Sequence, residues 1–174
     1  MMNRAMIPLI CMIMFLPLFS HAAQDQLKEE SKIPEFPVSE QSRAVFEKDT
    51  ILKNSVFKFL YYDSCGKGKA RDYKGSYTML SKDYLSKHFP KIKSAAEYEK
   101  DMENSDEIYH HVILMIERVD YIKNDMAKIK LQFEAGNEGV LQKMEAVIFF
   151  VKEQGIWKYH GINVSSLKVL ETLN

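Results

Sequence analysis

Residues 109–164, YHHVILMIERVDYIKNDMAKIKLQFEAGNEGVLQKMEAVIFFVKEQGIWKYHGINV, decide the fold. The stretch contains four runs rich in β-branched and aromatic residues, separated by turn signals at 123–125, 136–139 and 154–155. The second run alternates cleanly, because Ile129, Leu131 and Phe133 fall on one face and charged or amide residues on the other. We therefore expect a meander of four antiparallel strands at 110–122, 126–135, 140–152 and 156–164.

Two of these runs are apolar on both faces. In residues 112–116 and 146–151 successive side chains are nearly all Val, Ile, Leu, Met, Ala or Phe. An antiparallel strand with one wet face would alternate with polar residues instead. The pattern predicts a sheet covered on both sides, by helices on one and by a curl of the sheet, the C-terminal tail or another molecule on the other.

Helical patterns occupy the chain before the strands. Residues 42–64 carry an apolar stripe, with Ser39 or Ser42 as the first cap, and the helix should end before Gly66. Two further helical segments follow within 76–104, the first capped by Ser81 and the second opened by the capping box that starts at Ser94. The tail from Ser165 suggests one or two helical turns. The stripe consists of Val45, Leu52, Val56, Phe59 and Leu60.

Helices followed by antiparallel strands indicate an α+β fold, with N-terminal helices packed on a four-stranded curved sheet. The order of the elements, with the glycine turn and tryptophan-containing last strand Gly155-Ile156-Trp157-Lys158-Tyr159, resembles the NTF2-like superfamily. The resemblance implies a sheet that wraps around helices to form a cone. It permits isomerases, dehydratases, secretion scaffolds, immunity proteins and ligand binders, so it does not fix the function. Enzymes of that superfamily carry a carboxylate or histidine deep in the cone, and no motif here assigns that role to a numbered residue.

The N-terminus has the layout of a secretory signal. Arg4 precedes an apolar run at residues 5–18, and small residues at Ser20 and Ala22 suit cleavage after Ala22. The run is shorter than the ~20 residues that a spanning helix needs, so we expect no stable membrane anchor after cleavage. We predict a signal peptide at 1–22, a flexible linker at 23–40, a single domain at 41–174 and a periplasmic location.

Charge and cysteine content limit the function further. Removal of residues 1–22 leaves 23 basic and 24 acidic side chains, which argues against general nucleic-acid binding. Cys65 is then the only cysteine, so no intramolecular disulfide is possible. A lone exported cysteine is a buried thiol, a cross-link to another chain or a reactive thiol.

No pattern supports a catalytic or metal site. His110 and His111 are adjacent on a strand and should point to opposite faces, and no metal-ligand spacing is present. Asp63 and His160 are the one pair that we consider for acid–base chemistry. We expect no metal, no cofactor and no catalytic residue.

Candidate binding residues gather in residues 61–93. Residues 65–93 contain eight basic and two acidic residues, a net charge of +6, whereas residues 97–107 have a net charge of −5. Such segments are solvated helix faces that attract each other, or a docking surface. Tyrosines in this region line the core, a pocket or an interface. The candidates for binding a partner or ligand are Tyr61, Tyr62, Cys65, Lys67, Lys69, Arg71, Tyr77, Tyr84 and Trp157.

Three functions remain open. The leading hypothesis is an exported, non-enzymatic binding or adaptor protein of the bacterial envelope, for example an immunity protein that neutralises a periplasmic toxin, or a secretion-assembly component. The second is a small-molecule binder or enzyme that uses a tyrosine-lined cone, which predicts a pocket with a buried carboxylate or histidine. The third is a homodimer packed through the sheet face.

Overall fold

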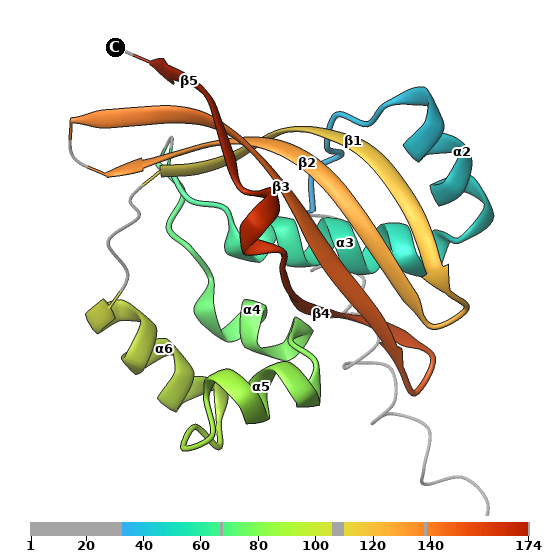
Figure 1. Cartoon of the computed structure of the whole chain (residues 1–174). Coiled ribbons are helices and arrows are strands. Elements are labelled where there is room, and N and C mark those ends of the chain that lie inside the picture. Colours follow the sequence, from blue (N-terminus) through green and yellow to red (C-terminus); the bar gives the residue numbers. More distant parts are fainter. Residues whose placement is uncertain (1–32, 67, 106–109, 138, 174) are drawn as a thin grey trace, which may run out of the picture. The chain divides into compact units, whose positions relative to one another are not determined.

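The computed structural model describes residues 33–66, 68–105, 110–137 and 139–173. These residues form an α+β domain that starts at Glu35, with helices packed on a curved, open antiparallel sheet (Figure 1). This arrangement is consistent with the cone expected from the sequence. The elements are α2 (Glu40–Lys48), α3 (Thr50–Asp63), α4 (Tyr73–Met79), α5 (Lys82–His88), α6 (Ala95–Ser105), β1 (His110–Lys123), β2 (Met126–Asn137), β3 (Val140–Glu153), β4 (Ile156–Ile162), the 3-10 turn η1 (Val164–Ser166) and β5 (Lys168–Leu173).

The four expected strands are confirmed, and a fifth strand joins them. β1 to β4 pair antiparallel in chain order, and irregularities in the β1–β2 register accompany the curvature of the sheet. The tail, expected to be helical, forms η1 and then β5, which pairs with Leu141–Glu145 of β3. This expectation was wrong because short β4 pairs only with Ile148–Glu153, which leaves the first half of β3 as an open edge. The tail satisfies that edge.

The single helix expected at 42–64 is two helices, α2 and α3, separated at Asp49. The Asp49 side chain accepts a hydrogen bond from the backbone N–H of Leu52 at 2.8 Å and so caps α3. Its own backbone N–H bonds to the carbonyl of Val45 and closes α2. Aspartate is a favoured N-cap, so the apolar stripe continues while the backbone restarts.

The domain begins before residue 41, the start that the sequence suggested. The Phe36 ring packs edge-on against Phe57, with centroids 5.3 Å apart. Pro37 and Ser39 exchange backbone hydrogen bonds with Ile116 of β1, at 2.9 and 3.0 Å. The last residues of the expected linker therefore cover the β1 edge. The predicted signal peptide at 1–22 and Lys67 lie outside the described residues.

Helices α4, α5 and α6 form a group below α3 in Figure 1, and the start of α5 is tied to β4 because the Ser81 N–H donates to the Tyr159 carbonyl at 2.8 Å. Ser81 caps α5 as expected, since its hydroxyl accepts from the N–H of Tyr84 at 3.1 Å. The Lys74 ammonium on α4 lies 2.6 Å from the Glu99 carboxylate on α6. That ion pair joins the basic segment to the acidic one, as two attracting helix faces would.

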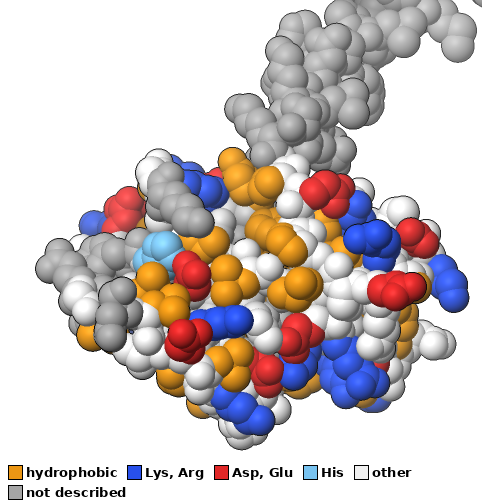
Figure 2. All heavy atoms as spheres, turned by 90° about the horizontal axis from the view of Figure 1, so that it is seen from above, with side chains coloured by type: hydrophobic (Ala, Val, Ile, Leu, Met, Phe, Trp, Pro, Cys, Tyr) orange, Lys and Arg blue, Asp and Glu red, His pale blue; other side chains and the backbone are white. Residues whose placement is uncertain are grey.

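The outer face of the sheet mixes apolar and charged side chains. Figure 2 views the domain from the sheet side and shows hydrophobic groups separated by Lys, Arg, Asp and Glu. Lys130 of β2 forms ion pairs with Glu117 at 2.9 Å and Glu145 at 2.8 Å, while Val147 and Phe149 on β3 stay half-buried. Among the described residues, no helix has the length and apolar character needed to cross a membrane.

Candidate functional site

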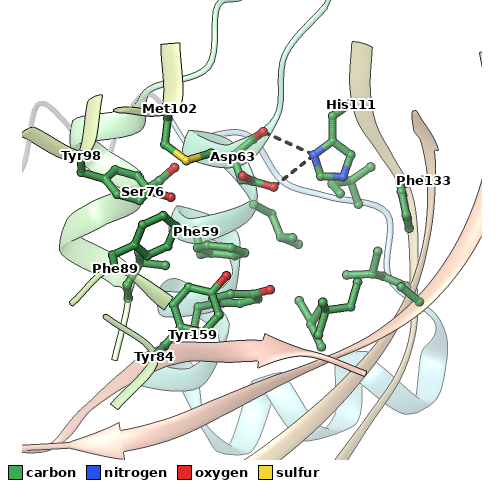
Figure 3. Close-up of a pocket in the computed structure, with 17 residues that line it drawn as sticks. Phe59, Asp63, Ser76, Tyr84, Phe89, Tyr98, Met102, His111, Phe133 and Tyr159 are labelled. Carbon is green, nitrogen blue, oxygen red and sulfur yellow. Dashed lines mark hydrogen bonds and ion pairs between the residues drawn. The ribbon is translucent and has the colours of Figure 1, made fainter. Parts of the chain in front are cut away.

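A cavity of about 200 Å³ lies between the helices and the inner face of the sheet. Figure 3 shows Ser76 and Tyr98 on its helical side, His111 and Phe133 on its strand side, and Asp63 between them. Its walls are mainly apolar, and Asp63, Ser76 and His111 supply the polar groups apart from tyrosine hydroxyls. The lining residues are Phe59, Leu60, Asp63, Ser76, Leu80, Tyr84, Phe89, Tyr98, Met102, His111, Ile113, Leu131, Phe133, Ala146, Ile148, Tyr159 and Ile162.

The end of α3 places Asp63 beside His111. After the helix ends, Cys65 pairs with the start of β1, because its N–H and C=O bond to the backbone of His111 at 2.9 and 3.0 Å. This short bridge fixes the helix end against the strand. The Asp63 carboxylate Oδ2 then lies 3.1 Å from Nδ1 of His111. Asp63 and His111 thus form an acid–imidazole pair that borders the cavity.

Arg71 returns to the same helix end through the loop after Cys65. Its Nε donates to the backbone carbonyl of Asp63 at 2.7 Å and lies 3.8 Å from carboxylate Oδ1. Lys69 Nζ donates to the carbonyl of Ser64 at 2.6 Å. A helix C-terminus carries partial negative charge, so basic side chains stabilise it and an acidic one there needs a cation nearby.

The Asp63 carboxyl is held in its ionised form. Burial opposes ionisation, but the hydrogen bond and charge of His111, with the charges of Arg71 and Lys69, outweigh it and lower the pKa below the ordinary value of 3.8. The side chain keeps 30 % of its surface exposed, although protein surrounds it. The cavity accounts for both facts, since it leaves the carboxylate accessible to a small molecule.

Tyrosine hydroxyls in the pocket stay neutral. Burial raises the pKa of Tyr84, Tyr98 and Tyr159 above the ordinary value of 10.0, and the charge of Asp63 adds to that rise. The rings hold one another, since Tyr159 stacks on Phe59 at 4.2 Å and meets Tyr84 edge-on at 5.2 Å. The aromatic wall is therefore closely packed, uncharged and able to donate hydrogen bonds.

Several of the predicted binding residues support this helix end. Cys65 is buried at 7 % exposure, and a guanidinium nitrogen of Arg71 lies 3.7 Å from its sulfur. The Lys69 ammonium lies over the Tyr61 ring, 4.6 Å from the ring centroid. Tyr62 is buried on α3. Cys65, Lys69 and Arg71 are brought together, but they surround Asp63 and do not line the cavity themselves.

The remaining predicted residues separate into two regions. Tyr84 lines the cavity, and Tyr77 packs behind it against Tyr98, with ring centroids 5.5 Å apart. Trp157 is fully buried in the core, and its indole N–H donates to Asp49 at 3.2 Å. Trp157 is therefore a core residue and does not form part of a binding surface.

The pair suggested from the sequence, Asp63 with His160, is not formed. His160 Nδ1 lies 3.0 Å from the buried Ser81 hydroxyl, and Asp63 pairs with His111. As expected, His110 and His111 point to different surroundings, because His110 Nε2 meets Glu134 at 3.1 Å. The sequence could not choose among the histidines, since the choice depends on the bridge between Cys65 and β1.

Sequence reasoning missed His111, Ser76, Tyr98 and Tyr159 as pocket residues. One signal was present: of two adjacent strand histidines, one must face inwards. Within the described ranges, no cluster of three or more His, Cys, Asp or Glu side chains could hold a metal ion. A scan of known protein-family models finds none that matches the chain, and a search of curated protein sequences finds no similar one.

Proposed function

We propose that this domain is a binding protein for a small, mainly apolar molecule, which it holds in the cavity between α3–α6 and the sheet. The observation that carries the proposal is a pocket of about 200 Å³ with apolar walls and one ionised carboxylate, Asp63, held by His111 and Arg71. Ligand sites in proteins combine apolar walls with a few convergent polar groups. The pocket thus meets the condition set for the small-molecule hypothesis, that it contain a carboxylate or histidine.

An acid–base enzyme is the second candidate, and one contact favours it. His111 Nδ1 lies 3.1 Å from Asp63 Oδ2, and both side chains border the cavity. A carboxylate that orients an imidazole is an arrangement suited to moving a proton on a bound molecule. Slow conversion of a bound ligand, lost in His111→Gln with binding retained, would favour this candidate over simple binding.

The proposal keeps the exported setting and the NTF2-like relationship that the sequence suggests. A protein partner, as an immunity protein or secretion component would need, also stays a prediction. The surface that it would use includes the exposed apolar side chains of η1 and β5. Val164 is 73 % exposed, Val169 51 % and Leu170 46 %.

The test is a ligand screen with a blocked-pocket control. Binding of uncharged single-ring compounds to the purified chain would be followed by ligand-observed fluorine or proton NMR. Ala146 is 1 % exposed and lines the cavity, so Ala146→Leu should fill the pocket and abolish binding. Val147, the next residue on β3, points to the outer face, so Val147→Leu is the matched control. Binding that survives Ala146→Leu would remove the pocket from the proposal.

A further inference from the structure

Ser76 on α4 is the starting point, because its hydroxyl has no hydrogen-bond partner. The residue is 2 % exposed, and Oγ is the one buried side-chain nitrogen or oxygen among the described residues that lacks a partner. A helical serine often bonds to the carbonyl four residues earlier. Here the backbone N–H of Ser76 donates to the Asp72 carbonyl at 2.9 Å, and the side-chain hydroxyl does not donate to that carbonyl as well.

An unpartnered buried hydroxyl lowers the stability of the folded state. Ser76 lines the cavity, where Figure 3 shows it beside Tyr98 on the helical side. In native structures such an orphan calls for an explanation. Oγ is itself shielded, so the hydroxyl must rotate towards the cavity for a ligand oxygen to supply the missing partner.

Asp63 makes a complementary demand. Its carboxylate is ionised and accepts hydrogen bonds only, so a ligand group that meets it must donate. Ser76 can donate or accept. A hydroxyl group satisfies both residues, because it donates its hydrogen and offers oxygen lone pairs in return.

The charges around Asp63 disfavour a cationic ligand. Arg71 Nε lies 3.8 Å from the Asp63 carboxylate and His111 3.1 Å, so the negative charge already has its partners and no excess attracts an ammonium group. A carboxylate ligand would face Asp63 across a low-dielectric space, where like charges repel strongly. The pocket therefore suits a neutral molecule.

Size sets the last limit. An apolar cavity of about 150 Å³ is known to hold benzene, and this one measures about 200 Å³. It has room for a single six-membered ring with one or two small substituents. The aromatic wall formed by Phe59, Tyr84 and Tyr159 would pack against such a ring.

We infer that the ligand is a neutral single-ring alcohol or phenol whose hydroxyl donates to the Asp63 carboxylate and whose oxygen, or a second oxygen on the ring, is bonded by Ser76. This inference rests on the proposed function, because it names the ligand class of the same pocket.

The experiment compares phenol with toluene, which has nearly the same shape but replaces the hydroxyl by a methyl group. Both are titrated into the purified full chain by NMR or calorimetry. Phenol should bind about tenfold more tightly, as expected for a buried hydrogen bond to a charged acceptor. Benzylammonium and benzoate serve as the cationic and anionic probes, and both should bind more weakly than phenol.

Ser76→Ala should lower the affinity for phenol and raise the melting temperature of the free protein. Phenol affinity should fall about fivefold while toluene affinity stays unchanged, since only phenol uses the serine. The free protein should melt at a higher temperature, because an unsatisfied buried hydroxyl is gone. Ser86→Ala, at an exposed serine of α5 that bonds to the Asp83 carbonyl, should change neither affinity.

The outcomes separate the two proposals. If none of the four probes binds, the proposed function fails. If toluene binds as tightly as phenol, or Ser76→Ala weakens both equally, the pocket binds ligands but the hydroxyl assignment is overturned. Tightest binding by benzylammonium or benzoate would likewise overturn the neutral-ligand inference while leaving the pocket in place.

Discussion

The two ends of α3 carry an aspartate each, and they use it differently. At the N-terminal end, Asp49 caps the helix and accepts hydrogen bonds from Tyr121 at 3.0 Å and Trp157 at 3.2 Å. At the C-terminal end, Asp63 opposes the helix dipole and depends on His111 and Arg71 for its charge. The Asp49 carboxylate is fully engaged in hydrogen bonds within the fold, whereas the Asp63 carboxylate also borders the cavity.

This difference separates a structural carboxylate from one available for binding. The Asp49 carboxylate caps α3 through Leu52 and also accepts from the buried Trp157 and the exposed Tyr121, so a ligand would have to displace one of these donors. Asp63 sits where a negative charge is unfavourable for the helix, yet it is kept ionised at the same cavity that the unpartnered hydroxyl of Ser76 lines. Polar groups maintained against the local preference of the fold are the better guide to function.

The largest effect should follow from Asp49→Ala. The change removes the N-cap of α3 and leaves the fully buried Trp157 indole N–H without its acceptor. We expect a loss of about 3 kcal/mol in the free energy of unfolding. Urea unfolding followed by fluorescence of the single tryptophan measures it. Asp49→Asn, which retains an acceptor oxygen, should lose less, and equal losses would contradict the capping role.

Asp63→Asn should cost less stability but more binding. The amide oxygen can still accept from His111, so we expect a loss of about 1 kcal/mol in unfolding free energy. Affinity for phenol should drop about tenfold, because the charged acceptor is lost. The same urea and titration experiments measure both quantities. A stability loss as large as that of Asp49→Ala, with phenol affinity intact, would erase the contrast between the helix ends.

Acid titration sharpens the contrast through the sign of the pKa shift. The pKa of Asp63 is lower in the folded chain than its ordinary value of 3.8, so ionised Asp63 stabilises the fold above that value. This contribution is lost as the pH falls through the lowered pKa. The stability gap between the wild type and Asp63→Asn should therefore be constant at neutral pH and should shrink below about pH 4. A gap that persists at pH 2 would mean that charge is not what Asp63 contributes.

The sequence predicted the fold well and the site poorly, for a physical reason. Alternation in residues 126–135 and the helical stripe of Leu52, Val56 and Leu60 depend on neighbours in the chain, so period and turn signals suffice. The fifth strand was missed because its partner edge on β3 is 23 or more residues away along the chain. Asp63 was singled out, but its partner was not.

His111 meets Asp63 only because Cys65 bridges to β1, and that register follows from tertiary packing. Ser76 is informative only through the absence of a partner, which no sequence pattern reveals. The sequence singled out Cys65, Lys69 and Arg71, but it left open whether the basic segment is a solvated helix face or a docking surface. In the fold, Lys69 and Arg71 bond the carbonyls that end α3 and so support the pocket indirectly.

Tyrosine titration gives the smallest effect and distinguishes the two ends residue by residue. Burial, the hydrogen bond to Asp49 and the Asp49 charge raise the pKa of Tyr121 to about 12. In the pocket, burial comes first and the Asp63 charge second in raising the pKa of Tyr84. Asp49→Asn should therefore lower the pKa of Tyr121 partway towards 10.0, since burial remains, and should leave Tyr84 unchanged.

Asp63→Asn should do the reverse, lowering the pKa of Tyr84 slightly and leaving Tyr121 in place. The ring Cζ chemical shifts of assigned tyrosines, followed by NMR between pH 9 and pH 12, report each residue separately. A raised pKa also means that each tyrosine favours the folded state below pH 10 and that this contribution is lost as the pH rises further. If either variant moved both tyrosines equally, the two carboxylates would belong to one coupled electrostatic unit, and the division of α3 into a structural end and a binding end would fail.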